Sequence, residues 1–386
     1  MDSAELKAWL RLGLTEGVGD VSARALLQHF GLPDAVFSAS EAALRECVSP
    51  RQALALLREP PELEDLLAKT ESWLSGAPQQ RCVVTLGDSA YPEALLNTED
   101  PPLLLYVLGR IDILAAGFAE CSRTGVAIVG SRNPTPQGTQ NARQFSAALG
   151  EAGMTVVSGL ALGIDGAAHE GALSGYAHSG WSTVAVVGTG LDRVYPRAHL
   201  DLAHRIAERG VLISEYPLGT APHSANFPKR NRIISGLCKA TLVVEAALKS
   251  GSLITARMAV EQGKDVFAIP GSIHSPQARG CHALIKQGAK LVESAQDILD
   301  ELPATSSPSS DGSVGAGSSV AAPSVELSSL ELGLLNALGF EPTSLDMLQQ
   351  RSGMDTATLQ ALLMGLELSG WVARLPGGKF QQLGRA

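Results

Sequence analysis

The chain has 386 residues, which favours two or three domains, and its 45% hydrophobic residues and 40 glycines are typical of a globular protein with many tight turns. A formal net charge of -9 excludes a protein coated in positive charge for nucleic-acid binding. A local basic groove remains compatible with this balance, because the field near a site depends on where the charges lie.

Residues 1–75 are predicted to form a helical domain of the SAM or helix-hairpin-helix type. Leu6, Trp9 and Leu10 form one apolar stripe, and a Gly-rich turn then leads into a helix over residues 21–29. The amides of such a turn can hold a backbone phosphate. The turn has the sequence Thr-Glu-Gly-Val-Gly-Asp, whose two acidic residues would oppose a phosphate. We therefore favour an ordinary connection between two helices.

From about residue 82, short β-branched runs alternate with helical stretches of about 12 residues. Each run is apolar on both faces, as a buried parallel strand must be. This pattern predicts an α/β domain over residues 76–302 with a doubly wound, mainly parallel sheet. The predicted strands are residues 126–129, 155–157, 184–187, 211–213, 242–244 and 266–269.

Residues 303–325 are rich in Ser, Gly, Ala and Pro and have almost no large apolar side chains. Such a segment cannot bury enough surface to offset its ordering entropy, so we predict a flexible linker. The tail, residues 326–386, shows helical runs at residues 330–338, 345–351 and 356–369 and then a hairpin, which together indicate a winged helix. A winged helix contacts duplex DNA or binds a partner protein. The tail has few cations, which favours a partner.

Nearly every predicted strand of the α/β domain is followed by Gly together with Ser or Thr. In an open parallel sheet, ligands bind beyond the carboxyl ends of the strands. Glycine lets backbone amides approach an anion, and a hydroxyl at a helix N-terminus adds a donor where the helix dipole favours phosphate. One Gly-Ser turn commonly just closes a helix, but several around one rim predict a phosphate site. The candidates are Ser131, Ser158, Gly159, Gly163, Ser250, Gly251 and Ser252.

A basic cluster, residues 223–236, lies between two predicted strands. Cations, a stackable ring and amide donors together suit a groove for single-stranded nucleic acid. A solvated helix start headed by Pro228 explains the cluster equally well when it is taken alone. The candidate binding residues in it are Asn226, Phe227, Lys229, Arg230, Asn231 and Arg232.

Motifs for catalysis and for nucleotide cofactors are missing. No Gly-x-Gly-x-x-Gly opens a first helix and no Gly-x-x-x-x-Gly-Lys-Ser/Thr occurs. Asp165 and His169 could pair on one helix, but we favour a capping role for Asp165 and a polar gap filled by His169. Glu215 and Glu245 could assist nucleotide hydrolysis, although contacts with loop amides or nearby arginines are favoured. We predict no catalytic residue and no cofactor.

The five cysteines are scattered and include no Cys-x-x-Cys pair, which argues against a zinc site and a disulfide framework. No stretch approaches the roughly 18 uninterrupted apolar residues of a membrane span. We therefore predict a cytoplasmic protein that binds no metal and no membrane.

The motifs together resemble the DNA-processing protein A family, also called DprA or Smf, of bacterial natural transformation. The match covers roughly residues 85–295 in order. The helical N-terminal region and the tail resemble the N-terminal and C-terminal extensions that some family members carry. Two departures are His282, where the family suggests Asn, and an insert at residues 176–181. The motifs that carry the resemblance are residues 129–132, 158–165, 188–196, 227–236, 250–255 and 270–272.

The resemblance implies an extended Rossmann domain that binds single-stranded DNA in a positive pocket, dimerises, protects incoming DNA and delivers it to the recombinase RecA, without a known catalytic reaction. The residues that it places in the pocket are Arg132, Phe227, Lys229, Arg230, Asn231 and Arg232, joined by Lys249, Ser250 and Ser252. The residue chemistry agrees with this placement: we expect Arg132, Lys229 and Arg230 to contact phosphates and Phe227 to face a base.

The alternative is a nucleotide phosphoribohydrolase similar to the lysine-decarboxylase-like Rossmann family. Those enzymes place Pro-Gly-Gly-x-Gly-Thr and a following Glu beside the phosphate. Residues 249–255 occupy the comparable loop without the double glycine or the Glu, which weakens this alternative.

Overall fold

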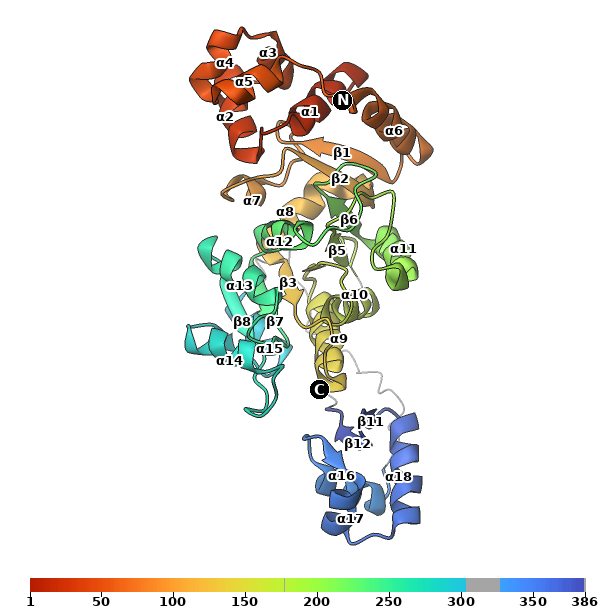
Figure 1. The fold of residues 1–386 in the computed structure, drawn as a ribbon. Coiled ribbons are helices and arrows are strands. Elements are labelled where there is room, and N and C mark those ends of the chain that lie inside the picture. The colour runs from red at the N-terminus through yellow and green to blue at the C-terminus, as the bar shows by residue number, and fades with distance from the viewer. Residues whose placement is uncertain (177, 303–326, 385–386) are drawn as a thin grey trace, which may run out of the picture. The chain divides into compact units, whose positions relative to one another are not determined.

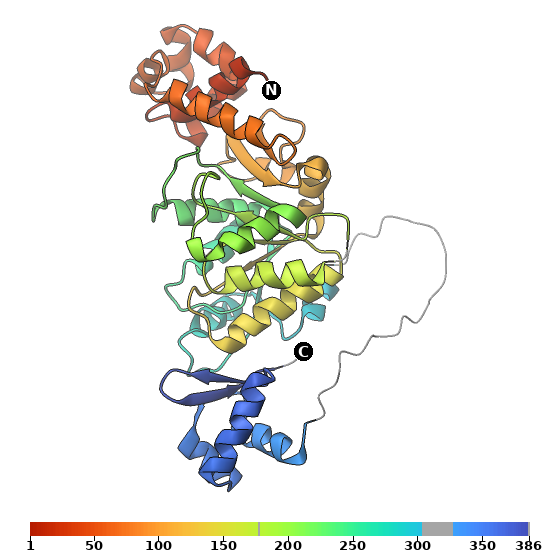
Figure 2. The same cartoon turned by 90° about the vertical axis from the view of Figure 1, so that its right-hand side faces the viewer.

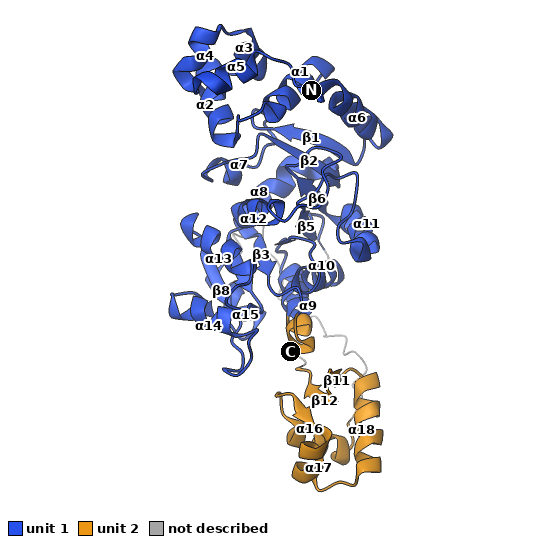
Figure 3. Cartoon of the chain, viewed as in Figure 1, with its two compact units in different colours: residues 1–133, 142–302 blue, residues 134–141, 303–386 orange. Residues whose placement is uncertain are grey.

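The structure is a computed structural model that describes residues 1–176, 178–302 and 327–384 (Figure 1). The predicted linker, residues 303–325, lies outside the described residues. Contacts divide the chain into two compact units, residues 1–133 with 142–302 and residues 134–141 with 303–386 (Figure 3). The domain boundaries expected from the sequence stay predictions.

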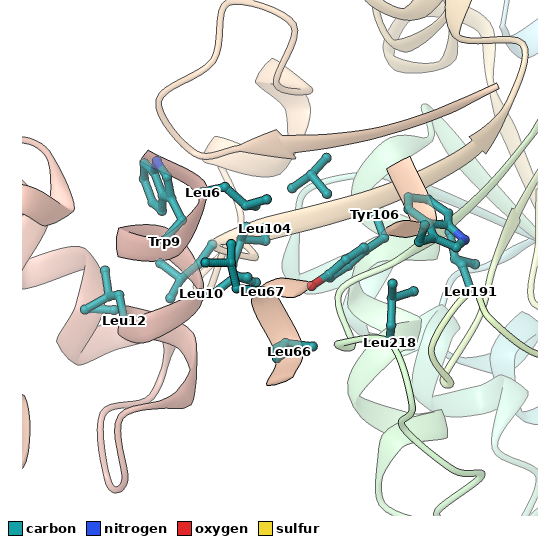
Figure 4. Packing of buried hydrophobic residues seen from close by; sticks show 14 of the residues in the cluster. Leu6, Trp9, Leu10, Leu12, Leu66, Leu67, Leu104, Tyr106, Leu191 and Leu218 are labelled. Carbon is teal, nitrogen blue, oxygen red and sulfur yellow. The ribbon is translucent and has the colours of Figure 1, made fainter. Parts of the chain in front are cut away.

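The N-terminal region is helical, and the predicted turn joins its first two helices. The apolar stripe of Leu6, Trp9 and Leu10 is buried and packs in one cluster with Leu104 and Tyr106 of strand β2 (Leu104–Gly109) (Figure 4). The helical region therefore shares a continuous core with the edge of the sheet. Its helices are α1 (Ser3–Leu14), α2 (Asp20–Phe30), α3 (Pro33–Ser38), α4 (Glu41–Cys47), α5 (Pro50–Leu56) and α6 (Leu63–Gly76).

The described residues of the first unit form a nine-stranded sheet of order β1-β2-β6-β5-β4-β3-β7-β8-β9. The strands from β6 to β9 in this order are parallel, whereas β2 pairs antiparallel with both β1 and β6. All six predicted strands are confirmed within two residues. The strands are β1 (Arg81–Thr85), β2 (Leu104–Gly109), β3 (Val126–Val129), β4 (Val156–Ser158), β5 (Thr183–Val186), β6 (Val211–Ser214), β7 (Ala240–Val243), β8 (Asp265–Ala268) and β9 (Lys290–Leu291).

Helices cover both faces of this sheet, so the doubly wound fold is confirmed. One face packs against α7 (Glu93–Leu96), α8 (Leu114–Thr124), α12 (Asn226–Leu237), α13 (Ser252–Glu261) and α14 (Arg279–Lys286). The other packs against α9 (Pro136–Glu151), α10 (Ile164–Gly175), α11 (Leu200–Arg209) and α15 (Ala295–Glu301). Figure 2 views the sheet from the side of α9, α10 and α11. Short 3-10 helices η1 (Ile111–Ile113) and η2 (Arg197–His199) precede α8 and α11.

The strand order reverses at β3, which lies between β4 and β7. The chain runs outward from β3 to β6 on one side and then from β7 to β9 on the other. The loops that leave β3 and β7 therefore diverge to opposite faces and open a crevice at their carboxyl ends, where doubly wound sheets bind ligands.

The insert at residues 176–181 ends in a core residue. Trp181 is fully buried, and its ring meets that of Phe118 edge to face, with 5.0 Å between centroids. Its Nε1 donates a hydrogen bond of 2.9 Å to the carbonyl oxygen of Arg110. This end of the insert thus contributes to the hydrophobic core beside α8.

The tail forms a winged helix, as predicted, around a core of its own that includes Leu334, Leu348 and Leu363. Its helix α18 contains no Lys or Arg, while Met364 and Leu368 on it are 64% and 81% exposed. The predicted protein partner of the tail stays a prediction. The elements are α16 (Ser329–Leu338), β10 (Thr343–Ser344), α17 (Leu345–Ser352), α18 (Thr356–Leu368), β11 (Val372–Leu375) and β12 (Lys379–Gln382), with strand order β10-β12-β11.

Across residues 1–176, 178–302 and 327–384, no helix has the length and apolar character that a bilayer crossing requires.

Candidate nucleic-acid-binding site

A cavity of about 800 Å³ lies at the carboxyl ends of β3 and β7. Residues 129–133 after β3 form one wall, the start of α12 forms a second, and residues 247–252 before α13 form a third. This is the crevice created by the reversal of the strand order. The predicted strand-end loops therefore meet at one place.

Helix α12 divides the basic cluster between two faces. It begins at Asn226, so the residues from there onward form a helix start, as the alternative expected, but Arg230 and Arg232 are buried and this helix start is not a solvated one. Pro228 is compatible with this because proline suits the first turn of a helix. Residues three or four apart share a helix face, so Phe227, Arg230 and Asn231 line the cavity together. The same rule sends Lys229 and Arg232 to another face.

Arg230 lies at the floor of the cavity with 4% of its surface exposed. Its Nη1 donates to the carbonyl oxygen of Val186, and its Nη2 lies 4.0 Å from Asp165 Oδ2. Burial lowers the pKa of Arg230, although Asp165 opposes this, and burial raises the pKa of Asp165. A guanidinium stays protonated at neutral pH, so a cation with reserve donors faces the cavity from a weakly screened position.

Gly159 makes room for that guanidinium. A Cβ at this position would lie 1.9 Å from Arg230 Nη1. The sequence predicted Gly159 as a phosphate-binding residue, but the structure places it directly against Arg230. Any larger residue would displace the floor of the cavity.

The rim of the cavity carries two aromatic rings and a cation. The Phe227 ring lies 5.7 Å from the Tyr195 ring between centroids at an angle of 34°, and Arg132 Cζ lies 5.4 Å from the Phe227 centroid. Aromatic rings and guanidinium planes of this kind stack on bases. Tyr195 was absent from the predicted site, although its position in the loop after β5 was a usable signal.

The loop before α13 supplies further polar groups. Lys249 is exposed at the cavity, and the hydroxyls of Ser250 and Ser252 lie 2.7 Å apart. Gly251 precedes the first residue of α13, whose N-terminal dipole favours an anion. On the opposite wall, Ser131 lines the cavity, and its Oγ accepts a 3.1 Å hydrogen bond from the Asn133 amide.

Besides Gly159, Lys229 and Arg232, three more predicted residues do not line this cavity. The Ser158 hydroxyl is buried and donates to the carbonyl oxygen of Ile128 at 2.6 Å. Gly163 has a φ of +83° and caps α10. Asn226 donates through its Nδ2 to the carbonyl oxygen of Gly188 at 3.1 Å. Each of them shapes the surrounding loops.

Lys229 and Arg232 belong to an ion-pair network that joins α12 to the N-terminal helices. The Arg232 side chain, 6% exposed, lies 2.7 Å from Glu215, 2.8 Å from Asp100 and 3.3 Å from Asp20. Burial lowers the pKa of Arg232, but the carboxylates of Glu215 and Asp100 more than offset this and raise it. Lys229 Nζ lies 2.9 Å from Asp20. The interpretation of Glu215 as an arginine partner is confirmed.

Asn133, Thr255 and Gln277 also line the cavity, and sequence reasoning missed them. Gln277 follows β8 and donates to the carbonyl oxygen of Asn133 at 3.2 Å. No motif marks it, because the contact arises from a loop far along the chain. Nearby, His282 hydrogen-bonds the carbonyl oxygen of Gly271 at 2.9 Å, so it supports the loop that follows β8.

His169 fills a polar gap, as favoured from the sequence. It is fully buried, with its Nδ1 2.7 Å from Thr183 Oγ1. The N-cap residue of α10 is Gly163, so the capping role favoured for Asp165 is wrong, and its carboxylate accepts a 3.3 Å hydrogen bond from the Ala161 amide. Burial lowers the pKa of His169 from 6.5 to about 3.

We expect His169 to make folding sensitive to acid. The unfolded chain takes up a proton near pH 6.5 and the folded chain only near pH 3, so the stability is complete above pH 6.5 and falls as the pH drops between these values. At pH 5 the loss is about 2 kcal/mol at 1.36 kcal/mol per pH unit. Urea unfolding at pH 7.5 and pH 5 should show this loss in the wild type and lack it in His169→Asn, with the exposed His274→Asn as control. Equal losses in all three proteins would contradict the prediction.

Within the described ranges 1–176, 178–302 and 327–384, no group of three or more His, Cys, Asp or Glu side chains is placed to hold a metal ion.

Residues 82–303, more than half of the chain, match the family of DNA recombination-mediator protein A. The chain belongs to this family. Residues 319–378 match the DprA winged helix domain. Protein Smf of Escherichia coli (strain K12) is 43% identical over 299 residues, covering 75% of this chain and 74% of the relative. Protein Smf of Synechocystis is 34% identical over 408 residues, covering 99% of this chain and all of the relative.

Two solved structures of DNA processing protein A are similar. That from Streptococcus pneumoniae has a TM-score of 0.61 and 35% identity, covering 78% of this chain and 98% of the other. That from Helicobacter pylori has a TM-score of 0.50 and 30% identity, covering 57% and 95%, and was solved to examine the single-stranded DNA binding mode of that protein. The family predicted from the motifs is therefore confirmed.

Proposed function

We propose that this protein binds single-stranded DNA in the cavity at β3 and β7. The observation that carries the proposal is the convergence of a buried cation, Arg230, with two exposed cations, Arg132 and Lys249, on one cavity of about 800 Å³. These residues come from three separate parts of the chain. The net charge of the chain is -9, so these cations are a local concentration of positive charge. A local concentration is enough, because the potential at a site depends on the charges nearby.

The aromatic rim favours a single strand over a duplex. Phe227 and Tyr195 offer ring faces at the mouth of the cavity. Bases in a single strand are free to stack on such rings, whereas those of a duplex are already stacked and paired. A base on the rim and its phosphate near Arg132 or Lys249 would engage both kinds of group at once.

The wider role that we propose follows from family membership: a cytoplasmic, dimeric protein that protects incoming single strands and loads RecA onto them during natural transformation and recombination. The Helicobacter pylori relative supports the single-strand step. A pull-down of RecA with the full chain, with and without a single-stranded oligonucleotide, tests the loading step. Failure to retain RecA in both conditions would contradict loading but not DNA binding.

A binding role is better supported than hydrolysis of a nucleotide. Among the described residues that line the cavity, the only carboxylate is that of Asp165, which lies buried near Arg230. Neither Glu215 nor Glu245, the candidate acids, lines the cavity, and Glu215 is paired with Arg232. We therefore propose that the protein is not an enzyme.

Filter binding of a labelled single-stranded oligonucleotide over a range of salt concentrations tests the DNA-binding proposal. We expect affinity to fall steeply with salt, and Arg132→Gln and Lys249→Gln each to reduce the logarithmic slope by about 0.7, the value for one phosphate contact on a single strand. Arg123→Gln is the matched control, because this exposed residue near the end of α8 lies just before β3, at the opposite end of that strand. Release of a base from a nucleoside monophosphate, with no retained oligonucleotide, would overturn the proposal in favour of hydrolysis.

A further inference from the structure

A groove of about 210 Å³ lies in the helical N-terminal region. Helix α2 contributes Leu27 and Gln28 to its lining, and the turn that follows β1 contributes Leu86 and Gly87. None of the described residues that line this groove also lines the cavity at β3 and β7. The groove is therefore separate from the proposed DNA-binding site.

The indole ring of Trp9 lines the groove and carries a hydrogen-bond donor without a partner. Trp9 is 2% exposed, and its Nε1 has no hydrogen-bond partner among the described residues (Figure 4). A Cβ at Gly87 would lie 3.6 Å from Trp9 Cζ2, which is on the same edge of the ring as Nε1, so this edge faces the groove. Buried polar atoms are normally paired, so this N–H indicates a group that a ligand satisfies.

Arg24 brings a second donor, and its charge is available. Its side chain is partly buried in the lining and forms no ion pair with the described residues. Asp20, one turn earlier on α2, lies 2.9 Å from Lys229 and 3.3 Å from Arg232, so it is already engaged. The carboxylate of Asp88, in the turn after β1, accepts a backbone hydrogen bond of 2.7 Å. The acids nearest in sequence to the groove residues therefore have other partners.

The rest of the lining suits one aliphatic side chain. Leu27 and Leu86 are partly buried, and Leu32 is 58% exposed at the groove. The 210 Å³ exceed the about 150 Å³ that enclose a benzene, but fall below the roughly 300–1,000 Å³ of ordinary small-molecule pockets. Gly31 and Gly87 are exposed, so the rim is open to a chain that runs past it.

We propose that this groove docks an acidic segment of a partner protein, with a leucine-sized side chain in the groove and a neighbouring carboxylate at Arg24 and Trp9 Nε1. An indole N–H and a guanidinium only donate hydrogen bonds, so they select an acceptor. A carboxylate is the acceptor that pairs best with a guanidinium. The phosphates of a nucleic acid would also accept, but they carry no aliphatic group to fill the groove.

Fluorescence polarisation of two labelled peptides on the full chain tests this proposal. The acidic peptide is Ser-Asp-Leu-Glu-Leu-Ser, and the neutral one, Ser-Asn-Leu-Gln-Leu-Ser, has the same shape. We expect wild type to prefer the acidic peptide, and Arg24→Gln to bind it about 3- to 10-fold more weakly, the effect of one lost hydrogen bond, with the neutral peptide unchanged. Arg58→Gln is the matched control, because Arg58 is an exposed arginine of the same helical region that does not line the groove.

A second variant, Gly87→Val, closes the groove. Gly87 has no positive φ, and a Cβ there would lie at ordinary contact distances of 3.6 Å from Trp9 and 3.9 Å from Leu32, so the backbone accepts a side chain. The branched side chain would occupy the groove, and we expect it to weaken binding of both peptides.

The outcomes separate this proposal from DNA binding. Filter binding of a single-stranded oligonucleotide should be the same for wild type and Arg24→Gln, so failure of either proposal leaves the other standing. Equal affinity of wild type for the two peptides, or no binding of the acidic one, would overturn the docking site. Displacement of the acidic peptide by an equal concentration of 4-methylpentanoate would overturn it in favour of a small carboxylate ligand, and displacement by oligo(dT) in favour of a nucleic acid.

Discussion

Replacement of Arg232 by alanine is expected to lower the free energy of unfolding by about 3–5 kcal/mol, the usual cost of removing one partner from a buried ion pair. Glu215 would lose its 2.7 Å partner while its own side chain is only 6% exposed. Asp100 and Asp20 would lose the same guanidinium, at 2.8 and 3.3 Å. Three carboxylates would then face one another without this cation, which is why the expected loss is large.

Urea unfolding measures this loss, and Lys229→Ala is its control. Lys229 pairs with Asp20 in the same network, but its side chain is 45% exposed, so its removal should cost no more than about 1 kcal/mol. Arg232→Ala that remains folded should bind oligonucleotides with nearly wild-type affinity, because Arg232 does not line the cavity. Normal stability with a large loss of affinity would contradict the structure and return Arg232 to the binding site that the sequence suggested.

Replacement of Gly159 by alanine is expected to weaken single-strand binding by about 10- to 100-fold. The new Cβ would lie 1.9 Å from Nη1 and 2.2 Å from Cζ of Arg230, so the guanidinium must leave the floor of the cavity. A hydrogen bond to a charged group contributes about 1.5–3 kcal/mol, which converts to the affinity loss given above. The overpacked site should also lower the free energy of unfolding by about 1–3 kcal/mol.

Gly251→Ala is the matched control for this substitution. Gly251 lines the main cavity, but a Cβ there would meet no atom within 4 Å, and the φ of -62° suits any residue. Filter binding and urea unfolding are measured for both variants. For Gly251→Ala we expect the affinity to change by less than about threefold and the free energy of unfolding by less than about 0.5 kcal/mol. Equal effects of the two substitutions would show that Gly159 does not act through Arg230.

The six strands β3 to β8 were predictable, whereas the edge strands β1 and β9 were not. The predicted runs, such as residues 126–129 and 211–213, are buried on both faces and therefore apolar throughout. Strand β1 begins with partly exposed Arg81 and Cys82, and β9 is only two exposed residues long. Edge strands need less apolar surface, so their sequence signal is weaker.

The candidate site was predictable as a region but not residue by residue. Parallel strands present their carboxyl ends at one edge, so Ser131, Lys249 and Ser252 could be expected to meet there. Tyr195 and Gln277 join them through loops whose path no local pattern determines.

The sequence by itself determined that this protein has a doubly wound sheet, a helical N-terminal region, a winged-helix tail and Gly- and Ser-rich loops at the carboxyl ends of its strands, because strand burial, helical periodicity and turn chemistry are local properties. Only the tertiary structure decided what each cation of the basic cluster does. The phase of α12 places Arg230 at the cavity and turns Arg232 towards Glu215 and Asp20, although the two arginines are two positions apart. The physical reason is that a helix separates neighbours by about 100° per residue, so charges adjacent in sequence acquire different partners from distant parts of the chain.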